Sequence, residues 1–310
     1  MPFDSSQEQR VTLKEAWAII KATIASFIED DAFRLAASVA FYASLSLAPM
    51  MIFTLDGAGR IWGQDAARSE IVRQTEHLLG HQGAQAVEKV IDQAHRETER
   101  GAAAIIGTAA LLFAATAVFA GLQGAMNEIW GVQADAHHQV WALVRKRLLS
   151  LGMLAALGFL MIVSLALSSI INLAMNSIGD SLPGSELLWQ ALNVLSSILV
   201  FSMLFALIFK ILPDVVIAWR DVWMGAAVTA VLFGLGRELI GFYLGRNTLS
   251  SVYGAAGSLV VLLLWVYYSS VILFFGAEFT QVFAHRRGRR IEPEPYATSL
   301  EAHCQEAVDT

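Results

Sequence analysis

Apolar residues are gathered along the chain into blocks about 20 residues long, the length of helix that crosses roughly 30 Å of hydrocarbon. More polar segments separate these blocks. They cover approximately residues 35–55, 102–122, 148–173, 187–212, 219–244 and 255–283. We therefore predict an all-α fold, a polytopic membrane bundle of six transmembrane helices with both chain ends on one side of the membrane.

Two of the polar segments carry the periodicity of amphipathic helices. In residues 11–30, apolar side chains recur on one face and charged ones lie opposite, a pattern typical of a helix lying in the membrane interface. The apolar positions are Leu13, Trp17, Ile20, Ile24 and Phe27. Residues 66–96 contain two further amphipathic stretches, which we expect to cap the outer mouth of the bundle.

This pattern divides the chain into three parts. Residues 1–34 form an interfacial N-terminal segment, residues 35–284 the six-helix membrane domain with a long outer loop at 57–100, and residues 285–310 a tail. The tail begins with four arginines and continues with acidic residues. We expect the arginines to lie against anionic headgroups and the remainder of the tail to be disordered.

Composition and charge agree with this division. The 310 residues are 56% hydrophobic and only 15% charged, whereas soluble domains carry about 25% charged residues. If the N-terminus lies inside, the basic residues gather on cytoplasmic segments, and the short outer loops contain only Arg246. The long loop 57–100 is an exception, but long loops follow the positive-inside rule weakly. We predict cytoplasmic N- and C-termini.

Arg237 and Glu238 lie inside an otherwise apolar stretch. A charge at that depth costs about 2.5–3.5 kcal/mol on insertion scales, so it normally faces protein or water. Glu238 shares a face with small residues spaced for close helix packing, including Ala226, Ala230 and Gly234. Arg237 lies about 100° around the helix, so we expect the two side chains not to meet. They either line a polar cavity or form a structural clamp between helices.

A second acidic residue, Glu278, interrupts the last apolar block. Its distance along the helix from the preceding connection places it near the cytoplasmic face. Candidate partners there are Arg34, Lys210 and Arg220. A structural ion pair is favoured over a catalytic role.

The first block has a polar stripe of residues four apart, which ends near Pro49. The stripe consists of Arg34, Ser38, Tyr42 and Ser46. Because a proline frees a carbonyl one turn earlier, we expect Pro49 to kink this helix. The stripe indicates either a water-lined path or hydroxyl groups that hydrogen-bond to the next helix.

Patterns of catalysis and of metal or nucleic-acid binding are missing from the sequence. The single cysteine, Cys304, excludes intrachain disulfides, and no basic face interleaved with aromatic residues indicates a nucleic-acid partner. Neither a phosphate-binding glycine loop nor a G-x-S-x-G or H-E-x-x-H motif is present. His77 and His81 lie one turn apart without a poised carboxylate. We expect no catalytic residue, metal or cofactor.

Several short segments spread over residues 30–284 together carry a resemblance to a known family. They are DAFRLAASVAFYASLSLAP (31–49), NEIW (127–130), FKILP (209–213), Gly225-Ala226, Phe242-Tyr243 and YGAAGSLVVLLLWVYYSSVILFFGAEF (253–279). In this order they resemble the YihY/BrkB family of bacterial inner-membrane proteins, whose older label is ribonuclease BN. The resemblance implies six spans in the bacterial inner membrane and a cytoplasmic N-terminus. It brings no agreed reaction or substrate.

These observations favour a transporter or a lipid- or envelope-handling protein of the inner membrane. Its interior would hold a polar cavity lined by the charged and hydroxyl residues above, and membrane lipids would be its partners. The alternative is a non-enzymatic envelope scaffold that binds a protein partner through loop 57–100. The ribonuclease label is disfavoured, because RNA hydrolysis needs a metal cluster or an acid–base pair on a basic surface. Substrate and oligomeric state do not follow from these residues.

Overall fold

The computed structural model describes residues 13–97, 117–134, 185–246, 257–289 and 291–299, and isolated positions between 152 and 170. The helices in these ranges are α1 (Leu13–Glu29), α2 (Ala32–Trp62), α3 (Gln64–Glu97), α6 (Ser185–Ile211), α7 (Trp219–Arg246) and α9 (Gly257–Arg286). Residues 117–129 are also helical. The strands are β1 (Val132–Ala134), β2 (Val215–Val216), β3 (Glu292–Pro293) and β4 (Ala297–Ser299). The described chain is mostly helical, as predicted.

Three helices in the described part of the chain are long and apolar enough to cross a membrane. They are Gln190–Ile211 in α6, Trp219–Phe242 in α7 and Val260–Arg286 in α9, which match the last three predicted blocks. The first predicted block lies in α2, whose apolar stretch Ala32–Ser46 is shorter. Block 102–122 is described only from residue 117, and most of block 148–173 lies outside the described residues.

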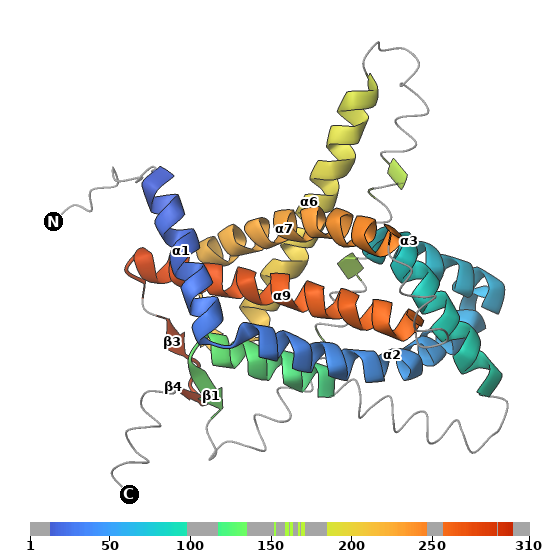
Figure 1. The fold of residues 1–310 in the computed structure, drawn as a ribbon, viewed down its shortest axis with the longest axis horizontal. Helices are drawn as coiled ribbons and strands as arrows, with labels where there is room; N and C mark the ends of the chain where they lie inside the picture. Colours follow the sequence, from blue (N-terminus) through green and yellow to red (C-terminus); the bar gives the residue numbers. More distant parts are fainter. Residues whose placement is uncertain are drawn as a thin grey trace, which may run out of the picture.

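Helix α9 is the centre of the described bundle. It packs against α1, α2, α3 and α7, while α6 packs on α7 and projects away from the other helices (Figure 1). Half of the apolar span of α9 is buried, against a third of the spans of α6 and α7. The faces of α6 and α7 that do not contact other helices expose large apolar side chains such as Leu195 and Leu239. Hydrocarbon suits such faces and water does not.

Close packing between α7 and α9 depends on two pairs of glycine and threonine. A Cβ at Gly225 would collide with Thr280, and a Cβ at Gly276 would collide with Thr229. Each threonine hydroxyl donates to the carbonyl of the glycine one turn earlier in its own helix, at 2.7 Å. The two helices therefore approach closely without leaving these hydroxyl groups unsatisfied.

Helix α2 and helix α3 both differ from their expected extents. Helix α2 continues through Pro49 to Trp62, so the proline does not end it. In α3, an Arg68 guanidinium nitrogen lies 2.5 Å from Asp92 Oδ1. A straight helix would separate residues 24 positions apart by about 36 Å. Helix α3 therefore doubles back on itself, and the two amphipathic stretches predicted within residues 66–96 lie against each other.

The start of the C-terminal tail is ordered, contrary to the expectation of disorder. Strand β3 pairs antiparallel with β2, and β4 pairs antiparallel with β1. The Glu294 amide also donates to the Asp214 carbonyl at 3.0 Å. This segment is polar, but the connections after helix 117–129 and after α6 offer it free backbone edges. Residues 300–310 of the predicted tail lie outside the described part.

Candidate functional site

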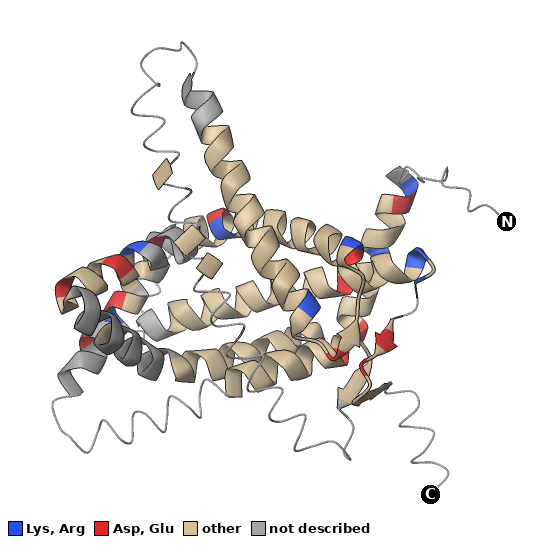
Figure 2. Cartoon of the chain, turned by 180° about the vertical axis from the view of Figure 1, so that it is seen from behind, with Lys and Arg blue, Asp and Glu red and all other residues tan. Residues whose placement is uncertain are grey.

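Charged residues in the described structure gather at the two ends of the bundle, and the middle of the long helices is almost free of them (Figure 2). One end is formed by the α1–α2 turn, the end of helix 117–129, the α6–α7 connection and the last turns of α9. We call this end the junction. The other end contains α3 and the last turns of α7.

Asp214 connects helix 117–129 to the α6–α7 connection at the junction. Its buried carboxylate accepts hydrogen bonds from Gln123 Nε2 at 3.0 Å and Asn127 Nδ2 at 2.8 Å. The Asp214 amide donates in return to Asn127 Oδ1 at 2.9 Å. A buried carboxylate with this many partners is a structural connector. Sequence reasoning missed the network, because nothing along the chain pairs a residue after the fourth block with one near 127.

Further charged groups tie the rest of the junction together. Arg289 forms an ion pair with the buried Asp221 at 2.6 Å, which joins the tail to the first turn of α7. Lys210 Nζ donates to the Ile217 carbonyl at 2.6 Å. Arg34 pairs with Glu128 at 2.9 Å, but both side chains are exposed, so this pair contributes about 0–1 kcal/mol.

Glu278 is fully buried in α9 at the junction. Within the described residues neither of its carboxylate oxygens has a hydrogen-bond partner. Its polar neighbours are Ser26 and Asp30, at the end of α1 and in the turn that follows. The predicted ion pair with Arg34, Lys210 or Arg220 is therefore wrong. The α1–α2 turn, and no basic helix end, covers this face of α9.

Asp30 lies in that turn beside Glu278. Partial burial raises the pKa of Asp30, and the charges of Glu29 and Glu128 raise it further, while the interaction with Glu278 lowers it. Asp31 follows in the left-handed conformation, with φ of 50°, a region that residues with a Cβ seldom adopt. The turn thus holds the Asp30 carboxyl group beside that of Glu278 in α9.

Arg237 and Glu238 lie toward the other end of α7 and form an ion pair at 2.9 Å. The expectation that they cannot meet is wrong, because the long arginine side chain reaches around the helix. The Glu238 side chain is 75% exposed. Ala226 and Ala230 on the predicted small-residue face are buried, but open space surrounds Gly234. The close packing thus ends before Glu238 is reached.

The polar stripe of α2 is satisfied mainly within its own helix. Ser38 and Ser46 each donate at 2.8 Å to the carbonyl three residues earlier. The Tyr42 side chain is largely exposed, and its ring also lies against Gly121. These two hydroxyl groups therefore donate within α2 and not to the next helix.

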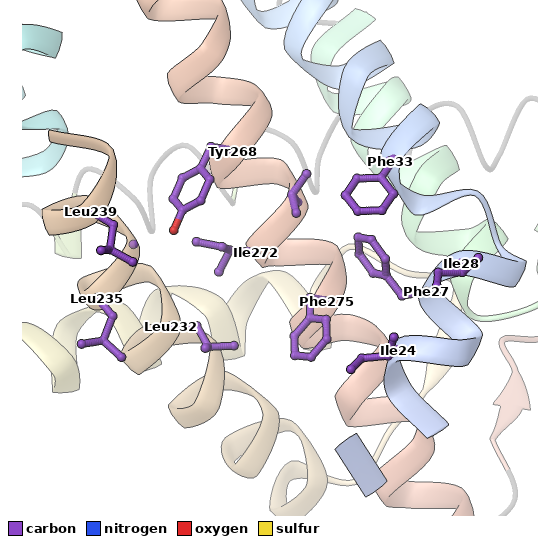
Figure 3. Close-up of a pocket in the computed structure, with 12 residues that line it drawn as sticks. Ile24, Phe27, Ile28, Phe33, Leu232, Leu235, Leu239, Tyr268, Ile272 and Phe275 are labelled. Atoms are coloured by element: carbon purple, nitrogen blue, oxygen red, sulfur yellow. The ribbon is translucent and has the colours of Figure 1, made fainter. Parts of the chain in front are cut away.

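An apolar groove of about 460 Å³ lies between α1, α7 and α9. Figure 3 shows α9 running between a wall from α1 and the start of α2 and a wall from α7. Tyr268 carries the only polar group among the lining side chains. These are Ile24, Phe27, Ile28, Phe33, Leu232, Leu235, Leu239, Tyr268, Val271, Ile272 and Phe275, with Gly236 beside them. The groove had no sequence signal, because its residues are ordinary members of apolar blocks.

Long apolar helices, exposed apolar faces and charges confined to the ends define a helical integral membrane protein. The family described as "Virulence factor BrkB" matches residues 23–301, and the chain belongs to this family.

Relatives of the chain are described as UPF0761 membrane proteins. One from Nitrosospira multiformis is 27% identical over 87% of this chain and 62% of its own length. Another from Legionella pneumophila is 25% identical over 87% of this chain and 63% of its own length. The chain thus spans about three-fifths of these curated relatives. Their names indicate no catalytic activity. No solved structure matches the chain.

Proposed function

We propose that this protein handles lipids in the bacterial inner membrane by holding an acyl chain in the groove between α1, α7 and α9. The observation that carries the proposal is the groove itself. Its lining is apolar except for the Tyr268 hydroxyl, and two of the helices that line it, α7 and α9, are long enough to span the membrane. A volume near 460 Å³ falls within the range of about 300–1,000 Å³ typical of small-ligand sites.

The occupant follows from the surroundings of the groove. Between membrane-spanning helices the available apolar molecules are lipid tails. Lipid tails are as apolar as leucine, so a tail is held by packing against a shaped surface and gains little from leaving other lipids. A polar solute would find one hydroxyl group there. This favours lipid handling over the polar-solute carrier that Arg237 and Glu238 suggest from the sequence.

The proposed topology has six spans with the junction at the cytoplasmic face. Support comes from the basic residues at that end, including Lys21, Arg286 and Arg289, which suit anionic cytoplasmic lipids. Helix α1 would then lie in the interface. Its exposed apolar residues, Trp17 and Ile20 among them, would face the acyl region while Ile19 and Phe27 pack on the bundle.

The test is photo-cross-linking in nanodiscs that contain a phospholipid with a photoreactive group on its acyl chain. Leu239→Trp narrows the groove, and Leu195→Trp places the same bulk on an equally exposed apolar position of α6. We expect labelling of groove peptides to fall severalfold in Leu239→Trp and to stay at the wild-type level in Leu195→Trp. Equal labelling in all three proteins would remove the proposal.

The alternative of an envelope scaffold depends on α3. This element doubles back on itself through Arg68, and its exposed residues include the charged Asp65, Glu70 and Arg73. Such a surface suits a water-exposed protein contact. If deleting residues 66–96 abolishes a cellular phenotype that Leu239→Trp leaves intact, the scaffold replaces the lipid proposal.

A further inference from the structure

The α1–α9 contact at the junction holds a group that the lipid proposal does not use. Glu278 lies about 12 Å from the end of α9, eight residues before Arg286, and its side chain is completely buried. Neither of its oxygens has a hydrogen-bond partner among the described residues. An ionised carboxylate in such a position would lose its hydration without a hydrogen bond of ordinary geometry to replace it.

The charged groups around Glu278 do not neutralise it. Glu29 at the end of α1 and Asp30 in the turn approach it from one side, and Glu128 of helix 117–129 acts on Asp30. Three arginines of the junction are engaged elsewhere. Arg34 of α2 pairs with Glu128, Arg286 donates to the Ala18 carbonyl, and Arg289 pairs with Asp221. The facing side chains thus add negative charge.

The groups around Glu278, which are Asp30 and Ser26, suit a proton better than a metal ion. Among the described residues, no three or more His, Cys, Asp or Glu side chains are arranged to hold a metal ion. Calcium would need six to eight oxygen ligands, and two carboxyl groups with one serine fall short of that number. A proton needs only the two carboxyl groups, because one acid can donate to the other and the pair then carries a single charge.

We infer that Glu278 and Asp30 form a proton-binding site that joins α9 to the turn between α1 and α2. The pair titrates as a unit, and loss of its shared proton places two carboxylates side by side. Partial burial raises the pKa of Asp30, which acts in the same direction.

Helix α1 connects this site to the groove. Ile24, Phe27 and Ile28 of α1 line the groove, and Ser26 of the same helix turn faces Glu278. The left-handed Asp31 ends the turn that joins α1 to α2. Repulsion between the two carboxylates would therefore move α1 away from α9 and widen the groove. This consequence rests on the proposed lipid function, whereas the proton site does not.

Infrared difference spectroscopy of the whole protein in nanodiscs, titrated with acid and base, tests the site. A protonated carboxyl group gives a carbonyl band that a carboxylate lacks. We expect this band to persist at neutral pH in the wild type and in Glu238→Gln, whose carboxylate is exposed, and to disappear in Glu278→Gln. If Glu278→Gln does not fold, Asp30→Asn must shift the titration of the band. Absence of the band from the wild type, or the same titration in all variants, overturns the inference.

A distance measurement tests the coupling separately. In a Cys304→Ser background, spin labels at the exposed positions Lys21 on α1 and His285 on α9 report their separation by pulsed dipolar spectroscopy. We expect the separation to increase as the pH rises through the titration of the pair in the wild type, and to stay constant in Glu278→Gln. A constant separation in the wild type would leave the proton site standing and remove its connection to the groove.

Discussion

Glu238 and Glu278 are equally conspicuous in the sequence, since each is an acid inside an apolar block, yet the structure treats them in opposite ways. Glu238 pairs with its neighbour Arg237 and remains 75% exposed. Glu278 is fully buried, and its carboxylate oxygens have no hydrogen-bond partner in the part of the chain that the structure describes. The difference lies in what covers each helix face. Close packing of α7 ends before Glu238, whereas the α1–α2 turn closes over Glu278. An acidic residue in a membrane helix thus indicates a function only once the segment that packs against it is known.

The same contrast extends from single residues to the two ends of the bundle. At the junction, Asp214 and Asp221 are buried and hydrogen-bonded or ion-paired across segments far apart in sequence. At the other end, the α3 ion pair is exposed, and the α7 ion pair is exposed at its Glu238 side chain. Burial makes a polar interaction costly to break, while solvent screens an exposed one. We therefore expect stability to depend on the junction much more than on the opposite end.

The largest effect is expected from Asp214→Ala. The substitution leaves Gln123 and Asn127 without their acceptor, at about 1–3 kcal/mol for each orphaned donor. Thermal unfolding of purified protein in detergent, followed by intrinsic tryptophan fluorescence, should show a clear loss of stability. Glu238→Ala is the matched control at the other end and should unfold close to the wild type. Similar losses of stability in Asp214→Ala and Glu238→Ala would contradict the expectation that stability depends mainly on the junction.

A smaller effect is expected from Gly236→Ala on α7. Its Cβ would collide with the Tyr268 ring and hydroxyl, so overpacking should cost about 1–3 kcal/mol. Gly234→Ala, two residues away, meets open space and should be neutral or stabilising, because alanine favours helix by about 1 kcal/mol over glycine. The same unfolding assay separates the two. If Gly234→Ala is the more destabilising, the packing face is misplaced.

The pH dependence of the free energy of unfolding should distinguish Asp30 from Glu238. The pKa of Asp30 is raised on folding, so the folded protein holds the Asp30 proton more tightly than the unfolded chain does. The stabilisation from this proton is complete below the ordinary pKa of 3.8 and is lost as the pH rises through the folded pKa. Unfolding measured as the pH rises above 3.8 should show this decline in the wild type and Glu238→Gln. Asp30→Asn should flatten it, and an unchanged decline would contradict the assignment.

The smallest effect is expected from Arg237→Gln. Glu238 is 75% exposed although Arg237 is half-buried, and an ion pair with one partner in solvent contributes about 0–1 kcal/mol. The variant should insert and unfold nearly as the wild type does. Its labelling by the photoreactive lipid should also be unchanged, because neither residue lines the groove. Loss of labelling in this variant would mean that Arg237 and Glu238 take part in lipid binding.

Some features of the fold and the site can be predicted from the pattern of residues along the sequence, and others cannot. The helices at 187–212, 219–244 and 255–283 are recoverable because twenty apolar residues in a row have few alternatives to a spanning helix. The position of Glu278 at the junction follows from counting residues along its helix. The identity of its neighbours does not, because Ser26 and Asp30 belong to the end of α1 and the turn after it, some 250 positions earlier in the chain. Their place beside Glu278 depends on how α1 packs on α9.

Local chemistry therefore specified that the chain is helical, membrane-embedded and amphipathic at its N-terminal segment, since hydropathy and periodicity act over a few turns. The groove, the strands of residues 292–299, the fold-back of α3 and the pairing of Asp30 with Glu278 depend on which surfaces meet. Contacts of that kind are chosen by the close fit of many side chains at once. No single residue type along the chain encodes them.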